Sequence, residues 1–333
     1  MKKKHAIILY NLGSPKNKKS FSIFSFLFNL FNDKNIINIK QPFRSILSFL
    51  ISITRLSKSK LIYKDIDLTL LPITNEQKKS LLSVIRAKNP NIKYNIYISM
   101  RYSPPRMKNI VENLKSFNPD KVIHIPLYPQ YSTTTTYSSF LEYQKYSKKL
   151  NLNNRYICCF FDNLKFIKAH IERIKYAMNS IHQTDNPMIL FSAHSLPVHI
   201  IKSGDPYQYQ IESSVSLIVK NFPGIEWRIS YQSKVGRLEW LSPDTENCIK
   251  EFAKEKRPLI LVPIAFVSEN SETTYELDIE YKKLMDGNLY FRVPTLDIST
   301  DFIECLSDLI DDNYTYSDKC PKSCKKCWKK ISN

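Results

Sequence analysis

The stretch that decides the fold is Ile189–Pro197, which reads Ile-Leu-Phe-Ser-Ala-His-Ser-Leu-Pro. Its first five residues are apolar or small and predict a buried strand, which Ser195 and Pro197 bring to an end. His194 therefore stands at the exit of this strand. Ligands of open α/β sheets bind at the carboxyl ends of strands, so a titratable side chain there is a candidate for chemistry. The alternative is a structural histidine, partly buried in a turn.

The composition favours a folded protein of two domains. The chain has 333 residues, of which 43% are hydrophobic, and this is enough for two packed cores. Its 49 basic and 31 acidic residues give a net charge of +18, which suits nucleic acid, an anionic membrane or an anionic substrate. The basic residues are mostly scattered lysines, so we expect solvated surfaces and no nucleic-acid partner. The five glycines form neither a G-x-G-x-x-G nor a Walker A spacing, which excludes the usual dinucleotide and P-loop sites.

Targeting signals are absent from the sequence. No apolar run reaches the roughly 18 residues that span a bilayer, and the charged N-terminus runs directly into a strand without a signal peptide. We therefore expect a cytoplasmic protein without a disulfide framework. Two apolar segments, Phe21–Phe31 and Phe43–Ile53, have helical spacing. These segments predict core packing. Alternatively, they form a hydrophobic lip, an apolar rim that holds a flat ligand or contacts the cytoplasmic face of the inner membrane.

Strands and helices alternate along the chain. Strands are predicted at His5–Tyr10, Tyr94–Met100, Lys121–Leu127, Met188–Ala193, Trp227–Tyr231, Leu259–Phe266 and Leu289–Val293. Helical patterns separate most of them, as at Arg106–Phe117 and Gln210–Phe222. This order predicts an α/β fold with parallel sheets. We expect an N-terminal domain over residues 1–160, a C-terminal domain over 161–315, and a basic, cysteine-rich tail over 316–333.

Three carboxylates follow the predicted strand Leu259–Phe266 at helical spacing. Glu272, Glu276 and Glu280 stand at i, i+4 and i+8, which places them on one face of a helix. Like charges at this spacing repel one another by about 0.2–0.5 kcal/mol per pair. A solvated acidic face and a path for a divalent metal or a proton both explain the pattern. Because His194 also follows a parallel strand, one cleft can hold it together with Glu272. An imidazole and a carboxylate are suitable ligands for Fe²⁺.

Ordered segments along nearly the whole chain carry a resemblance to a known family. They are Asn11–Gly13, Met100–Tyr102, Pro126–Ser132, Ser192–Pro197, Gly204–Tyr207, Tyr231–Gly236 with Trp240, and Pro263–Tyr281. From about residue 4 to about residue 310 the sequence resembles the ferrochelatases. These lyases insert ferrous iron into protoporphyrin IX to form protohaem in haem biosynthesis. The resemblance implies two Rossmann-like chelatase domains with parallel sheets and a ligand cleft between them.

The resemblance also implies roles for individual residues. His194 and Glu272 match the family's catalytic pair, and Glu276 and Glu280 continue its metal path. Six residues match substrate contacts: Arg55, Tyr63, Arg101, Tyr131, Tyr207 and Trp240. Arg55 and Tyr63 would hold the propionates, and Phe21–Phe31 falls in the hydrophobic lip. The chemistry agrees, because a free-base porphyrin loses two N–H protons as the metal enters and therefore needs a base that acts near neutral pH.

Three positions depart from the family pattern. Asn270 stands where the family has a histidine, Tyr137 replaces a glycine, and a glycine-rich stretch after Tyr63 is missing. An amide at 270 cannot exchange protons. Two alternatives therefore stay open: a chelatase for coproporphyrin or another tetrapyrrole, and a catalytically impaired porphyrin- or haem-binding protein.

The tail carries a cluster of cysteines at 320, 324 and 327. Clustered thiols in a cytosolic protein indicate metal binding. Some ferrochelatases hold a [2Fe–2S] cluster with C-terminal cysteines and a fourth from elsewhere, for which Cys158 and Cys159 are candidates. The alternative is a disordered basic tail.

Overall fold

The computed structural model describes residues 2–181, 186–236, 238–314 and 320–328, so part of the expected tail, at 316–319 and 329–333, lies outside the described residues. The chain forms two compact units. Unit 1 consists of Met1–Leu127, Ser132–Cys158 and Leu306–Tyr314, and unit 2 of Tyr128–Tyr131, Cys159–Cys305 and Thr315–Asn333. Each contains one four-stranded parallel sheet. The α/β fold class is therefore confirmed.

Unit 1 is built on a sheet with the strand order β2-β1-β3-β4. Its strands are β1 (Lys3–Asn11), β2 (Ile92–Met100), β3 (Lys121–Pro126) and β4 (Asn154–Tyr156). Its helices are α1 (Ser20–Phe31), α2 (Phe43–Asp65), α3 (Leu70–Lys88), α4 (Met107–Phe117), the π-helix η1 (Thr133–Tyr137) and α5 (Ser138–Ser147). The central strand β1 is fully buried from Ala6 to Leu9, as a parallel strand covered by helices on both faces should be.

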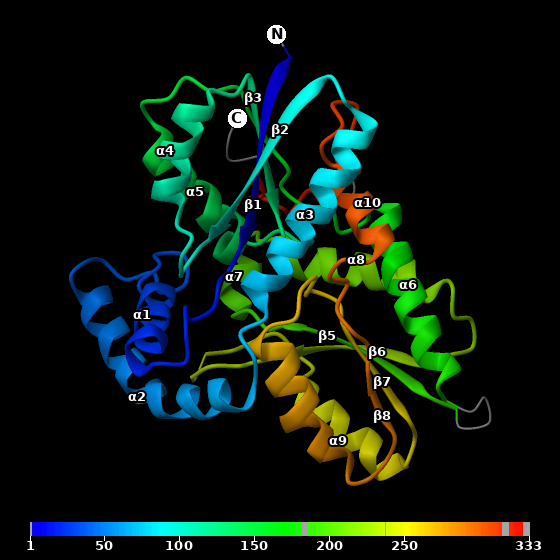
Figure 1. The fold of residues 1–333 in the computed structure, drawn as a ribbon. Helices are drawn as coiled ribbons and strands as arrows, with labels where there is room; N and C mark the ends of the chain where they lie inside the picture. Colours follow the sequence, from blue (N-terminus) through cyan, green and yellow to red (C-terminus); the bar gives the residue numbers. More distant parts are fainter. Residues whose placement is uncertain (1, 182–185, 237, 315–319, 329–333) are drawn as a thin grey trace. The chain divides into compact units, whose positions relative to one another are not determined.

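Unit 2 repeats this plan with the strand order β6-β5-β7-β8 (Figure 1). Its strands are β5 (Met188–His194), β6 (Trp227–Gln232), β7 (Leu259–Pro263) and β8 (Tyr290–Arg292). Its helices are α6 (Leu164–Asn179), α7 (Val198–Lys202), α8 (Tyr207–Val219), α9 (Thr245–Glu255), the π-helix η3 (Glu272–Tyr281) and the 3₁₀-helix η4 (Lys282–Met285); α10 (Thr300–Asp308) follows β8.

Strand β5, which holds Ile189–His194, is a central strand of the second sheet. β5 pairs with β6 on one side and β7 on the other, so its apolar residues are buried throughout. The register places His194 beside Gln232 and Ser192 beside Pro263. The segment that leaves β7 therefore starts next to the exit of β5. This pairing brings Glu272 toward His194.

Two of the elements predicted from the sequence differ in extent or type. The strand expected over Leu259–Phe266 ends at Pro263, and the carboxylate-bearing helix is a π-helix rather than an α-helix. Helix α3 was not predicted, because polar Thr74 and Gln77 occupy its buried face and hide the apolar period.

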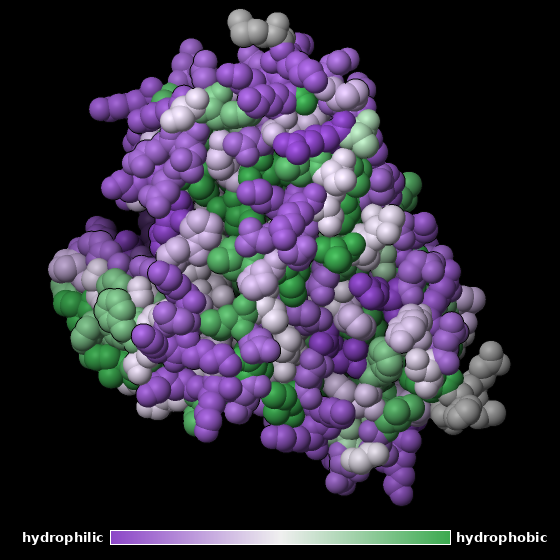
Figure 2. All heavy atoms as spheres, viewed as in Figure 1, coloured by the Kyte–Doolittle hydropathy of each residue, from purple (hydrophilic) through white to green (hydrophobic). Residues whose placement is uncertain are grey.

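Several apolar side chains of α1 and α2 remain exposed in unit 1. They are Phe21, Phe43, Ile46, Phe49, Leu50, Ile53 and Leu61, with 48% to 81% of their surface accessible. Figure 2 shows hydrophobic residues gathered over the place of α1 and α2. None of the helices in the described part of the chain is long and apolar enough to cross a membrane.

Candidate active site

The imidazole of His194 and the carboxylate of Glu272 meet at the carboxyl ends of β5 and β7. Nδ1 of His194 lies 2.9 Å from Oε2 of Glu272. Both side chains are partly accessible, at 38% and 27%. Because the carboxylate accepts a hydrogen bond at Nδ1, it favours the tautomer that leaves Nε2 with its lone pair when the ring is neutral.

Glu276 is held one turn further along the π-helix by residues that the sequence analysis missed. Its Oε2 accepts hydrogen bonds from Ser233 (2.5 Å) and from the amide of Gln232 (3.5 Å). Its Oε1 accepts one from the Tyr281 hydroxyl at 2.7 Å. Glu280 follows on the same helix and is partly buried. A signal for Tyr281 was its i+5 spacing from Glu276, which matches a π-turn.

The carboxylates set the protonation of the histidine. Burial disfavours the charged imidazole, but the negative charges of Glu272 and Glu276 more than offset it and raise the pKa of His194 above its ordinary value of 6.5. Burial, then repulsion from Glu272, raises the pKa of Glu276, and the hydrogen bonds from Ser233 and Tyr281 oppose this. In the described residues, no three His, Cys, Asp or Glu side chains are arranged to hold a metal ion. The 2.9 Å contact between His194 and Glu272 is one through which a proton can pass.

Asn270, where the family pattern has histidine, supports the start of the π-helix. Its side-chain oxygen accepts a hydrogen bond from the Glu272 amide at 2.8 Å, and its own amide group donates to the Ser268 carbonyl. Its backbone carbonyl accepts from the Thr274 amide at 2.9 Å. Asparagine is a favoured residue at helix starts for this reason.

Three predicted substrate contacts belong to unit 2. The Tyr207 hydroxyl donates to the backbone carbonyl of His194 at 3.0 Å. Trp240 pairs with Pro197 in an isolated antiparallel bridge, so it lies against the turn that follows His194. Tyr131 is fully buried, and its backbone amide donates to the side chain of Gln210 at 2.7 Å. The first two residues are therefore joined directly to the His194 segment.

The other three belong to unit 1. Tyr63 is buried in α2. The guanidinium of Arg55 lies 5.5 Å from the ring centroid of Phe31, and burial alone lowers its pKa. Among the described residues no carboxylate forms an ion pair with Arg55. Its charge is thus available to an anion.

Arg101 is committed to contacts inside unit 1. It forms an ion pair with Asp33 at 2.8 Å and a longer one with Glu142 at 3.5 Å, and it donates to Ser138. Asp33 is buried and also accepts from the Tyr102 hydroxyl at 2.8 Å. Asp33 follows Asn32, the C-cap of α1, so this network ties the end of the apolar helix to the residues that follow β2.

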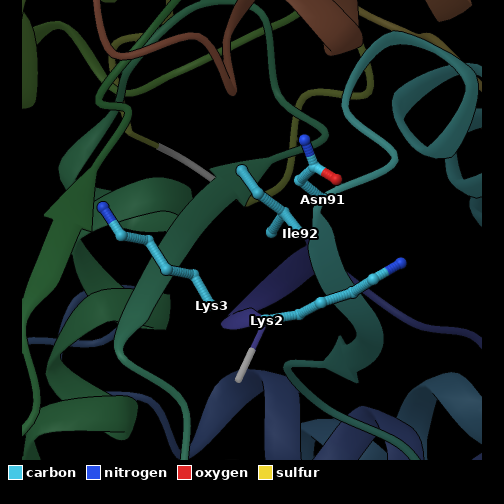
Figure 3. A pocket seen from close by; sticks show the side chains of 4 residues that line it. All are labelled: Lys2, Lys3, Asn91 and Ile92. Carbon is cyan, nitrogen blue, oxygen red and sulfur yellow. The ribbon is translucent and has the colours of Figure 1, made fainter.

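A surface hollow in unit 1 is lined by neither a carboxylate nor an imidazole. It is bounded by Lys2, Lys3, Asn91 and Ile92 at the N-terminal ends of β1 and β2, and the two lysine side chains extend away from each other (Figure 3). The carboxyl ends of parallel strands are the usual ligand-binding edge, and this hollow lies at the opposite edge.

Four thiols gather in unit 2. Hydrogen bonds from Cys159 and Cys324 lower the pKa of the Cys320 thiol, and Cys327 interacts with Cys324. The amide nitrogen of Gln210 lies 3.3 Å from the sulfur of Cys320 and 3.6 Å from that of Cys159. Of the two candidates for a fourth cysteine, Cys159 is hydrogen-bonded to Cys320 of the tail.

Comparison with known proteins identifies the family. The family model described as Ferrochelatase matches residues 4–314. The ferrochelatase of Wolbachia pipientis wMel is 44% identical over 311 residues, covering 92% of this chain and 98% of its own. That of Rickettsia felis is 43% identical over the whole of both chains, and that of Pelagibacter ubique is 42% identical over 97% of this chain and 98% of its own. The chain belongs to the ferrochelatase family. It is accordingly a ferro-lyase of haem biosynthesis that inserts iron into protoporphyrin.

Solved structures agree with the ferrochelatase fold. SirB from Bacillus subtilis with Fe³⁺ aligns with a TM-score of 0.57 at 12% identity, covering 92% of this chain and 94% of its own. The sirohydrochlorin chelatase SirB in complex with cobalt aligns with a TM-score of 0.53 at 10% identity, over 91% of this chain and 92% of its own. At such low identity the likeness establishes the chelatase fold alone.

Proposed function

We propose that His194 is the base that accepts the pyrrole protons during iron insertion. The observation that carries this proposal is the 2.9 Å contact between His194 Nδ1 and Glu272 Oε2. Porphyrin and Fe²⁺ give the metalloporphyrin and two protons, so a base must act twice. Neutral His194 takes a proton at Nε2, and Glu272 stabilises the imidazolium through Nδ1. Glu272, Glu276 and Glu280, spaced along one helix, then accept the protons in turn and offer carboxylate oxygens to the substrate iron.

An anaerobic assay with Fe²⁺ and protoporphyrin IX tests this role. We expect His194→Ala to abolish iron insertion while porphyrin binding, followed by fluorescence, is retained. His199→Ala is the matched control, because His199 is exposed five residues further along the chain. Wild-type turnover in His194→Ala would refute the proposal. Porphyrin binding without turnover in the wild type would indicate the impaired binding protein instead.

We further propose that Arg55 and Tyr63 bind a porphyrin propionate. The support is the available charge of Arg55, which contrasts with Arg101 and its two carboxylate partners. A guanidinium binds a carboxylate through two parallel hydrogen bonds. Arg55→Ala should raise the KM for protoporphyrin without changing that for iron, whereas Lys58→Ala, an exposed change on the same helix, should change neither. An unaltered porphyrin KM in Arg55→Ala would exclude this contact.

A [2Fe–2S] cluster bound by Cys159, Cys320, Cys324 and Cys327 is our proposal for the thiols. Four thiolates are the usual ligand set of such clusters, and the cluster supplies one-electron redox chemistry when bound. The mutual hydrogen bonds of the thiols bring them together in unit 2, and cluster binding would draw the four sulfurs from their present positions, which form no metal-binding group in the described residues. Protein purified without oxygen should show the absorption of an iron–sulfur cluster, which Cys159→Ser should remove and Cys158→Ser should leave. A wild-type spectrum without this absorption after reconstitution with iron and sulfide would refute it.

We also propose that the exposed apolar side chains of α1 and α2 contact an anionic membrane surface. Large apolar side chains together with a basic protein favour such adsorption, and the chain carries a net charge of +18. The protein should sediment with vesicles that contain phosphatidylglycerol, and Phe43→Ser with Leu50→Ser should weaken this. Leu164→Ser, a change at an exposed apolar residue of unit 2, is the control. Equal sedimentation of all three proteins would refute the proposal.

A further inference from the structure

The side chain of Arg292, at the end of β8, joins two points on the segment that carries Glu272 and Glu276. Its Nε and Nη2 donate to the two oxygens of Asp278 at 2.8 and 2.6 Å, and its Nη1 donates to Glu269 at 2.5 Å. Glu269 precedes Glu272 by three positions, and Asp278 follows Glu276 by two. One guanidinium therefore brackets both carboxylates of the site.

The ion pairs of Arg292 can hold Glu269 and Asp278 in a fixed orientation. Arg292 and Glu269 expose only 12% and 14% of their side chains. Burial disfavours the charged Glu269, but Arg292 and the Thr273 hydroxyl offset it and lower the pKa of Glu269. A buried pair that stays ionised, such as Arg292–Glu269, and a pair with two parallel hydrogen bonds, such as Arg292–Asp278, each hold their partners in one orientation. An exposed ion pair does so much less.

Two further hydrogen bonds, from residues on or just after β8, hold the chain near Glu269 and near Asp278. The Thr295 amide donates to Oε1 of Glu269 at 3.0 Å, and the Tyr290 hydroxyl donates to the Leu277 carbonyl at 2.8 Å. A π-helix is rare and seldom persists beyond a single turn, whereas η3 extends from Glu272 to Tyr281. Its conformation must therefore be maintained by contacts from outside the helix, and Arg292 makes one of them as an ion pair with Asp278.

We propose that Arg292 is a positioning residue for iron insertion, which sets Glu272 against His194 and Glu276 beside Ser233. The proposal rests on the roles given above to His194 and Glu272. Arg292 acts through the backbone of η3 and lies outside the group that exchanges protons. A misplacement of about 1 Å can cost roughly 10²-fold in rate. Loss of Arg292 should therefore lower the rate of metal insertion and spare porphyrin binding.

The test compares Arg292→Met and Arg292→Lys with Arg228→Met. Arg228 pairs with Glu251 at 3.0 Å in the same unit, and among the described residues it forms no ion pair with η3. We expect kcat to fall by about tenfold or more in Arg292→Met, with protoporphyrin affinity within about twofold of the wild type, and to fall less in Arg292→Lys. Hydrogen exchange of the amides of 272–281 should become faster in Arg292→Met. Arg228→Met should alter neither readout.

Unchanged kcat and unchanged exchange in Arg292→Met would overturn the proposal, as would a loss of porphyrin affinity equal to the loss of kcat. If Arg292→Met does not fold, Asp278→Asn and Glu269→Gln remove one branch of the contact each and should show the same pattern. His194→Ala in the same assay separates the two proposals. Retained turnover there would refute the base, whereas an inactive His194→Ala beside a fully active Arg292→Met would refute the positioning role alone.

Discussion

Tyr281 donates a hydrogen bond to Oε1 of Glu276 over 2.7 Å, although five positions separate the two residues. On an α-helix, residues three and four apart are the neighbours, so this contact is a consequence of the π-helix. Burial and repulsion from Glu272 raise the pKa of Glu276, and Tyr281 opposes both. The hydroxyl therefore favours the ionised form of Glu276 beside His194 and Glu272.

Replacement of Tyr281 by phenylalanine should shift the pH dependence of the enzyme. Without the hydroxyl, the pKa of Glu276 rises further, because one of the hydrogen bonds that lower it is lost. Since a proton acceptor must be ionised, the acidic limb of the kcat profile should move to higher pH. Tyr176→Phe, an exposed change in α6, should leave the profile in place. Superimposable profiles for Tyr281→Phe and the wild type would show that Glu276 takes no proton.

The titration of His194 in metal-free protein should report its carboxylate neighbours. We expect its pKa, followed by imidazole NMR signals, to lie above 6.5 in the wild type. In Glu272→Gln it should fall markedly, because burial then acts with less opposition. The contact accordingly stabilises the fold below pH 6.5, and this contribution is lost as the pH rises through the raised pKa. An equal pKa in both proteins would contradict the contact.

The Asp33–Arg101 pair in unit 1 should matter mainly for stability. Asp33→Ala leaves the mostly buried Arg101 without its nearest carboxylate, and breaking a buried pair costs about 3–5 kcal/mol. Asp67→Ala is the matched control, since Asp67 is exposed and its pair with Lys18 spans 3.9 Å; we expect a loss below about 1 kcal/mol there. Urea unfolding measures both. A similar small loss in the two variants would show that the Asp33 network does not anchor α1.

The parts of the fold that sequence predicted well are those in which burial dictates the residue type. β5 and β7 are continuous apolar runs because each is covered on both faces, so both strands were visible in the sequence. Because His194 and Glu272 both follow the carboxyl ends of parallel strands, one cleft was expected to hold them, and the pairing of β5 with β7 brings them together. The same reasoning could not find Gln232 and Ser233, because polar residues after a strand are common and their contact with Glu276 depends on the position of η3.

The π-helical conformation of η3 could not be predicted from the local sequence. Carboxylates at i, i+4 and i+8 fit an α-helix equally well, and the contacts that hold η3 come from Tyr290 and Arg292 on β8. Likewise, Cys158 and Cys159 are adjacent in sequence, and the position of the tail decides which thiol joins Cys320. Both outcomes are tertiary, and no periodicity encodes them.

Asn270 offers a sharp test of how this chain replaces the expected histidine. Its side-chain oxygen accepts from the Glu272 amide, so Asn270→Ala should destabilise the start of η3 by about 1 kcal/mol, as loss of a helix cap does. Asn270→Asp keeps the acceptor and should retain most of the stability. Because the cap orients Glu272, kcat should fall in Asn270→Ala and largely persist in Asn270→Asp. Equal unfolding free energies for the wild type and Asn270→Ala would mean that this side chain does not cap η3, and proton exchange at this position would then be the property to compare in Asn270→His.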